Sequence, residues 1–305
     1  MRRKATPLLW LLPCMLTARI AVAQDMEPRR WTHLPVDLNV LGVAYAYSTG
    51  DLQFDPALRI EDATVEMHTV LLSYNRSFAL FGQTARVDVQ VPLQHGLWDG
   101  LVNGEPRSVT REGLGDPRIR FSIDLAGAPA LRGEDFLEYR RSHPVNTIVG
   151  AAVAVRLPLG DYDDSKLINL SDHRFVIEPQ LGVLQTIGPW SFELTGSAFI
   201  YTDNHEFFNG NTYEQDPLLA VQAHVVRTFK NGWWISAGGA YGTGARSTVN
   251  GVANDDERRN LLYGASIGIP LDRSQSLTIG YIRRDPLADA GIDSDNFIVG
   301  WSIRF

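Results

Sequence analysis

The chain has 305 residues, of which 44% are hydrophobic, and its 35 acidic and 28 basic residues give a formal net charge of −7. This acidic balance argues against nucleic acid as a partner, because nucleic-acid binding requires a basic face. Beyond residue 23, no segment approaches the roughly 18 apolar residues of a membrane-spanning helix, which excludes a helical inner-membrane transporter. The remaining classes are a large soluble β protein and a membrane β-barrel.

Residues 1–23 have the three parts of a secretory signal peptide. Three basic residues follow Met1, an apolar run extends over 8–16, and Ala21-Val22-Ala23 provides a small-residue cleavage site. The only cysteine, Cys14, lies within this signal, so the exported chain is expected to carry no disulfide. Cleavage removes four basic residues and leaves a net charge of 24 − 35 = −11.

Residues 24–37 contain Pro28, Pro35 and the pair Arg29-Arg30, and predict a short periplasmic lead-in. Strand patterns then recur over residues 38–305, which we interpret as one β-barrel domain. Twelve strands are predicted, at 38–48, 64–78, 82–92, 116–125, 147–158, 174–187, 190–203, 214–229, 232–242, 258–270, 275–285 and 295–305. An even number of strands is typical of single-chain bacterial barrels.

The connections between these strands alternate in length. Short turns are predicted at 79–81, 188–189, 230–231 and 271–274, and long polar loops at 49–63, 93–115, 159–173, 204–213, 243–257 and 286–294. This alternation is typical of the periplasmic turns and extracellular loops of outer-membrane barrels. The exception is the periplasmic connection 126–146, in which residues 132–141 could form one or two helical turns, although a solvated loop is favoured.

The last strand carries one strongly apolar face and ends on an aromatic residue. Alternate positions from Phe297 to Phe305 are apolar, so one face of the strand should be buried or face lipid. Gly300, Ile303 and Phe305 match the assembly signal of bacterial outer-membrane barrels, and Ile298 departs from it because a polar residue is usual there. The barrel-assembly machinery is therefore an expected partner.

Aromatic residues are predicted to form two belts at the membrane interfaces. The periplasmic strand ends carry Phe78, Phe81, Trp190, Phe229, Trp233 and Phe305, and the outer ends carry Tyr47, Phe175, Tyr201, Tyr213, Tyr241, Tyr263, Tyr281 and Phe297. Together these patterns predict an all-β, up-and-down antiparallel barrel of about twelve strands in the cell outer membrane. Outer-membrane lipid and lipopolysaccharide would surround it.

Charged residues on the non-lipid faces of the strands are candidates for lining the lumen. They are Arg86, Asp88, Arg118, Arg120, Asp124, Arg156, Glu178, Glu193 and His224. One interpretation is a mixed-charge pathway that selects solutes, and the other is a self-paired structural network that fills a narrow barrel. Strand number does not decide between them, because twelve lies between filled barrels of about eight strands and open channels of sixteen or more.

Acidic clusters in the loops raise the question of enzyme activity. Asp172-His173 opposite Asp255-Asp256 could activate water as in a surface protease of the omptin kind, but Asp is common in turns and no spacing is diagnostic. A lipase would need a histidine on the lipid face of the wall, and His224 is predicted to project inward. We therefore expect no enzyme, no cofactor and no dedicated metal site, and bridging of divalent ions to lipopolysaccharide stays an equally general possibility.

Several stretches resemble an outer-membrane family named for a "putative MetA-pathway of phenol degradation". They are GLGD (113–116), LPLGDYDDSKLINLSDHRF (157–175), GPWSFELTGSAFIYTDN (188–204), EQDPLLAVQAH (214–224) and NGWWISAGGAYGTGARSTVNGVANDD (231–256). The resemblance implies a transporter and brings no catalytic residues. We therefore expect a channel or transporter for small, phenol-like organic solutes, with a structural or adhesive barrel without flux, or a surface hydrolase, as alternatives.

Overall fold

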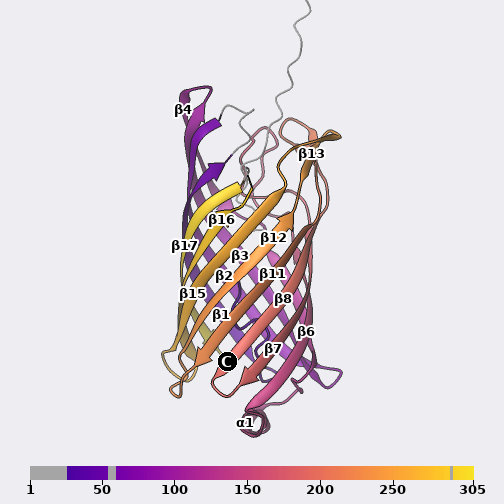
Figure 1. Cartoon of the computed structure of the whole chain (residues 1–305), viewed down its shortest axis with the longest axis vertical. Helices are drawn as coiled ribbons and strands as arrows, with labels where there is room; N and C mark the ends of the chain where they lie inside the picture. Colours follow the sequence, from indigo (N-terminus) through magenta and orange to yellow (C-terminus); the bar gives the residue numbers. More distant parts are fainter. Residues whose placement is uncertain (1–25, 54–59, 289–290) are drawn as a thin grey trace, which may run out of the picture.

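The computed structural model describes residues 26–53, 60–288 and 291–305, so the expected signal peptide lies outside the described residues. Twelve strands form a closed antiparallel barrel, which confirms the predicted fold class. In chain order they are β1 (Asn39–Gln53), β2 (Ile60–Leu80), β3 (Gln83–Val102), β5 (Arg118–Ala126), β6 (Val145–Arg156), β7 (Val176–Ile187), β8 (Trp190–Tyr201), β11 (Leu218–Thr228), β12 (Trp234–Gly244), β15 (Arg258–Pro270), β16 (Gln275–Pro286) and β17 (Gly291–Arg304). Neighbours in sequence are neighbours in the wall, as the tilted strands of Figure 1 show.

The first and last strands close the barrel. Strand β1 pairs with β17 from Val40 opposite Arg304 to Gln53 opposite Gly291. The final residue takes part in this closure, because Phe305 and Asn39 exchange two backbone hydrogen bonds of 2.9 and 3.0 Å. Closure satisfies the edges that an open sheet would expose, which is the condition for a sheet in a bilayer.

The wall has an apolar outside and a polar inside. Along β7, Ile177 and Leu181 are exposed, whereas the alternate residues Glu178 and Gln180 are buried. The last strand follows the same rule, with Phe297 and its alternate neighbours exposed. Exposed aliphatic side chains around a charged interior are suited to lipid on the outside of the barrel.

The two ends of the barrel differ. We call the end with short turns and the C-terminus the periplasmic end, because bacterial barrels place short turns there. At the opposite end β3 extends beyond the wall and pairs with β4 (Glu105–Leu114), and loop segments form a second, four-stranded sheet (Figure 1). Its strands are β9 (Asn204–Phe207), β10 (Asn211–Gln215), β13 (Ser247–Val249) and β14 (Val252–Ala253). These long loops are therefore more ordered than the sequence predicted.

Two residues predicted for the outer aromatic belt are buried instead, Tyr201 at the end of β8 and Tyr213 in β10 of the loop sheet. Their ring centroids lie 4.5 and 4.9 Å from the Arg174 guanidinium carbon. The placement in the belt is wrong for both because the Arg174 cation attracts the faces of their rings. Tyr241 and Phe297 are exposed on the wall, as expected.

The described part of the chain contains one α-helix, α1 (Gly133–Ser142), which lies below the periplasmic end (Figure 1). We expected a solvated loop here, and the structure corrects this. Acidic residues in the first turn and basic residues in the last turn stabilise the helix dipole. Its one buried residue, Phe136, meets the His33 ring edge-on at a centroid distance of 4.9 Å.

Among the described residues, no helix is long and apolar enough to cross a membrane.

The predicted periplasmic lead-in occupies the lumen instead. Residues 26–36, which we call the inner segment, run inside the wall, and Trp31 within it is only 1% exposed. The chain leaves the lumen near α1, where the Val36 N–H donates to the Leu131 carbonyl oxygen. The sequence could not predict this position, because an irregular segment with two prolines has no alternation of apolar and polar residues. Its contacts are also with residues that are distant in the sequence.

Candidate functional site in the barrel lumen

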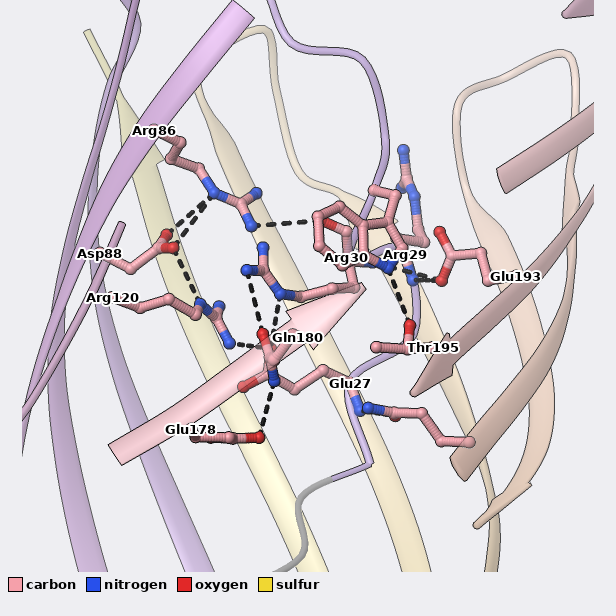
Figure 2. Close-up of polar contacts among 12 residues, drawn as sticks. Glu27, Arg29, Arg30, Arg86, Asp88, Arg120, Glu178, Gln180, Glu193 and Thr195 are labelled. Atoms are coloured by element: carbon pink, nitrogen blue, oxygen red, sulfur yellow. Dashed lines mark hydrogen bonds and ion pairs between the residues drawn. The ribbon is translucent and has the colours of Figure 1, made fainter. Parts of the chain in front are cut away.

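The inner segment meets most of the predicted lumen residues in one charged cluster (Figure 2). Its centre is Glu27, whose Oε1 lies 3.2 Å from Arg118 Nη1 and whose Oε2 lies 2.5 Å from Arg120 Nη1. The backbone N–H of Glu27 donates to Gln222 Oε1 across the lumen at 3.2 Å. Glu27 thus connects the inner segment to β5 through its carboxylate and to β11 through its backbone N–H.

Strand β7 supplies the next pair of contacts. Arg118 also donates to Glu178 Oε2 at 2.9 Å, and Glu178 Oε1 accepts a 2.7 Å hydrogen bond from Gln180. Gln180 in turn accepts from Arg30 Nη2 of the inner segment at 3.3 Å. The chain of hydrogen bonds runs from β5 to β7 and back to the inner segment.

Strand β3 closes the cluster on the other side. Asp88 lies opposite Arg120 in the β3–β5 register and accepts its Nε–H at 3.1 Å. Asp88 is also 3.1 Å from Arg86 Nε, and Arg86 Nη2 donates to the Arg30 carbonyl oxygen at 3.2 Å (Figure 2). Arg86 therefore holds the backbone of the inner segment rather than its side chains.

Glu193 on β8 binds the backbone of the inner segment directly. Its Oε2 accepts the N–H groups of Arg29 at 2.7 Å and of Arg30 at 3.2 Å. Two adjacent backbone donors that converge on one carboxylate form an anion-binding turn of the kind that backbone nests provide. The positive φ of 64° at Arg29 produces this turn.

Trp31 docks on a flat patch of the wall made of two glycines. Gly150 on β6 and Gly182 on β7 lie opposite each other, and a Cβ on either would come within 2.2 Å of the indole ring. The indole N–H donates to Thr195 Oγ1 at 2.8 Å. Any larger residue at these two glycines would displace the ring, so this part of the wall is shaped to receive Trp31.

The cluster is electrically balanced. Arg30, Arg86, Arg118 and Arg120 provide four positive charges, and Glu27, Asp88, Glu178 and Glu193 provide four negative ones. Ionisable groups inside a membrane are expected to pair in this way because an isolated charge there is costly. Two of these eight groups, Arg30 and Glu27, come from the inner segment, which the alternation of the wall strands could not identify.

The remaining predicted lumen residues lie around this cluster. His224 Nε2 is 3.0 Å from Gln222 Oε1, and Arg156 lies 3.6 Å from Asp172 near the outer end. Asp124 is half-buried beside the inner segment, at a small hollow that Arg30 and Trp31 also line. We expected Asp124, Glu178 and Glu193 to pair with the inward arginines; Arg118 does contact Glu178, whereas Arg156 forms an ion pair with Asp172.

Sequence reasoning missed the inner segment's own contributors. These are Glu27, Arg30 and Trp31, together with the two glycines that receive the indole. A usable signal was present, since opposite charges and a tryptophan follow directly after the predicted export signal. Such a composition is unusual for a solvated linker.

The three residues of the predicted assembly signal are all in β17 or directly after it. Gly300 lies opposite Ala44 of β1, where a Cβ would come within 3.3 Å of the Ala44 Cβ, and Ile303 lies opposite Leu41. Phe305 is exposed at the periplasmic end. Recognition of these residues by the assembly machinery stays a prediction.

The acidic loop residues have structural partners of their own. The backbone N–H of Asp172 and the Ser171 hydroxyl donate to Asp116 at 2.8 and 2.6 Å, and burial followed by the nearby Asp172 charge raises the pKa of Asp116. Asp256 accepts from the backbone and hydroxyl of one loop serine at 2.8 and 2.6 Å. At the surface, hydrogen bonds from Lys166 and from a neighbouring serine lower the pKa of Asp163 to about 2. These contacts order the loops.

A closed antiparallel barrel with an apolar outer wall and a charged lumen defines an outer-membrane β-barrel protein. Twelve strands and a lumen that holds a whole peptide segment fit the channel-type members of this class. The chain belongs to the family described as "Putative MetA-pathway of phenol degradation", which matches residues 39–285.

Solved structures support the same fold. An outer-membrane channel from Pseudomonas putida F1 aligns with a TM-score of 0.74 at 19% identity, over 92% of this chain and 100% of that chain. The transport unit of the autotransporter AIDA-I from Escherichia coli aligns with a TM-score of 0.50 at 8% identity, over 93% of this chain and 94% of that chain. No curated protein matches the sequence significantly.

Proposed function

We propose that the protein is an outer-membrane channel for small organic solutes whose lumen is restricted by its own inner segment. The observation that carries the proposal is that side chains of the wall do not fill the barrel by themselves. Gly150 and Gly182 leave room that Trp31 occupies, and Glu193 binds backbone rather than another wall residue. A lumen that admits a peptide segment has the cross-section for a small solute once the segment moves.

Two further observations favour this function over a scaffold without flux. The inner segment is held by the buried Trp31 and by hydrogen bonds and ion pairs, so it can leave without breaking the strand pairing of the wall. The family description names phenol degradation, and the similar structure from Pseudomonas putida F1 is called an outer membrane channel. Phenol-like compounds are therefore the solutes to test first, and hydrolase activity is not part of the proposal.

The test is solute flux into liposomes that contain the purified protein. We expect measurable entry of phenol-sized solutes, a small mean current in planar bilayers well below that of a sixteen-stranded porin, and a larger current once the inner segment is undocked. Protein-free liposomes give the passive background. Absence of flux both in the wild type and in a variant with an undocked segment would contradict the channel and favour a structural or adhesive barrel.

The surroundings of the barrel follow from the same proposal. The exposed apolar wall would contact outer-membrane lipid, and the acidic loops at the outer end would contact lipopolysaccharide through divalent ions. Assembly would use the machinery that recognises the closing strand. Depletion of divalent ions should then loosen the loops and leave the barrel wall intact, which limited proteolysis of the loops would measure.

A further inference from the structure

A cavity at the periplasmic end is lined by several cationic side chains and by no carboxylate. It has a volume of about 260 Å³ and lies between the inner segment, α1 and the periplasmic ends of β6, β7, β8 and β11. Arg29, Arg140 and Lys230 line it, together with His33 and His143, and none of the lining residues is Asp or Glu. We call it the mouth cavity.

The cations of the mouth cavity come from three separate parts of the chain. Arg29 belongs to the inner segment, Arg140 to the last turn of α1, and Lys230 to the turn after β11. Within residues 26–53, 60–288 and 291–305, no carboxylate oxygen lies within 4 Å of their side-chain nitrogens. Glu193, the acidic residue with an electrostatic effect on Arg29, already accepts two backbone N–H groups.

Without an anion, the electrostatic cost falls mainly on Arg29, because Arg140 and Lys230 are exposed to solvent. Burial, and then the positive charge of Arg140, lower the pKa of the Arg29 guanidinium. Every other arginine of the lumen cluster described above has a carboxylate partner, so the mouth cavity is a local exception. An incoming anion would relieve the repulsion and gain charge-assisted hydrogen bonds.

The rest of the cavity wall is apolar or aromatic. Ile148, Leu184 and Val226 line one side, and Tyr139 stacks on His143 at a centroid distance of 4.1 Å on another. Binding sites for small organic molecules combine such apolar walls with a few placed polar groups. An adjoining hollow shares Arg29 and Arg140 but also contains Glu134, so it does not have the same charge character.

We propose that the mouth cavity binds a small aromatic carboxylate, with its ring against the apolar wall and its carboxylate between Arg140 and Lys230. This rests on the proposed channel function and narrows its solutes to a class that includes organic anions. A site at the exit of the lumen would hold the solute on the periplasmic side. The inner segment would take part in recognition through Arg29.

The test measures binding of benzoate to the purified full-length protein by isothermal titration, with benzyl alcohol as the uncharged counterpart and inorganic phosphate as the non-aromatic one. Benzoate should bind about tenfold or more tightly than either, and added salt should weaken it. Arg140→Gln and Lys230→Gln should each weaken benzoate about tenfold. The matched control is Arg141→Gln on the same helix, whose partner is Glu138 and which does not line the cavity.

The outcomes separate this inference from the channel itself. Equal binding of benzoate and benzyl alcohol, phosphate binding as tight as benzoate, or equal effects of the Arg140 and Arg141 changes would overturn the site. Flux of uncharged phenol into liposomes reports on the channel independently, because Arg140→Gln and Lys230→Gln change exposed residues that do not contact the lumen cluster. Flux with no charge-dependent binding refutes only the site, and binding without flux refutes only the channel.

Discussion

Replacing Trp31 by alanine should undock the inner segment and leave the barrel wall folded. The indole is only 1% exposed, and burial of an aromatic side chain of about 150–250 Å² contributes about 4–6 kcal/mol at about 25 cal/mol per Å². Measured tryptophan-to-alanine changes in cores cost about 3–5 kcal/mol, which agrees. Trp31 precedes β1 and belongs to no strand. The lost free energy therefore weakens the docking of the inner segment and leaves the stability of the barrel wall unchanged. Each step of about 1.4 kcal/mol changes an equilibrium constant tenfold, so the ratio of docked to undocked inner segment should fall by a factor of roughly one hundred to a few thousand.

Two measurements read this change directly. Mean current in planar bilayers should rise in Trp31→Ala, and trypsin should cut after Arg29 or Arg30, whose backbone is protected in the wild type by Glu193. Trp190→Ala is the matched control, because Trp190 is 39% exposed on the outside of β8. Its heat stability can fall slightly without any change in current.

Wild-type current together with wild-type resistance to trypsin in Trp31→Ala would show that the indole does not hold the inner segment in the lumen. A variant that no longer folds would be uninformative on its own, so Gly182→Val provides a second route to the same state. Its side chain would enter the space of the indole ring, since a Cβ there lies 2.0 Å from the indole nitrogen. Both variants should behave alike if docking of Trp31 controls the lumen.

Three other changes test the lumen, the wall and assembly. Arg118→Ala together with Arg120→Ala removes two of the four cluster cations, while Asp88 keeps Arg86 and Glu27 keeps Arg30, so negative charge is in excess. Current should rise and shift towards cations while thermal stability falls, and unchanged ion selectivity would count against the network. Leu194→Arg, at a position in the middle of β8 that is 54% exposed, should destabilise the barrel by about 2–4 kcal/mol in folding titrations, far more than Leu194→Ala; equal costs would show that this position does not face lipid. Deletion of Phe305 should reduce heat-modifiable barrel in membranes more than deletion of Gly251 in a loop, and equal yields would remove the assembly role of the last residue.

The barrel was predictable because its strands carry a local signal. Alternation of two residues places Ile177 outside and Glu178 inside without any knowledge of their neighbours, and the predicted bounds of β15 match the structure at both ends. The loop sheet was not predictable in the same way. Its strands are two to five residues long and lie outside the membrane, where no apolar face is required.

The wall residues of the lumen cluster were predictable, and the residues of the inner segment were not. Parity turned Arg118, Arg120 and Glu178 inward, but the position of Glu27 depends on contacts that span 91 and 93 residues. Helix α1 was not predicted as a helix for a related reason. Only Phe136 of its residues is buried, and half of its residues are charged, so it has no apolar face in the sequence. The position of an irregular or polar segment depends on contacts with residues distant in the sequence, and the local alternation of residue types does not predict those contacts.

The inner segment is covalently joined to the first strand of the wall, and this connection determines how long each opening of the channel would last. It joins β1 only a few residues after its last docked side chain, so its local concentration at the docking site is millimolar or higher. Closure of a loop of about ten residues takes roughly 10–100 ns, so an undocked segment would meet its site again far faster than an electrical recording can resolve. The measured current would then be a time average over many unresolved openings, and its size would report the fraction of time that the segment is undocked rather than the width of a static pore.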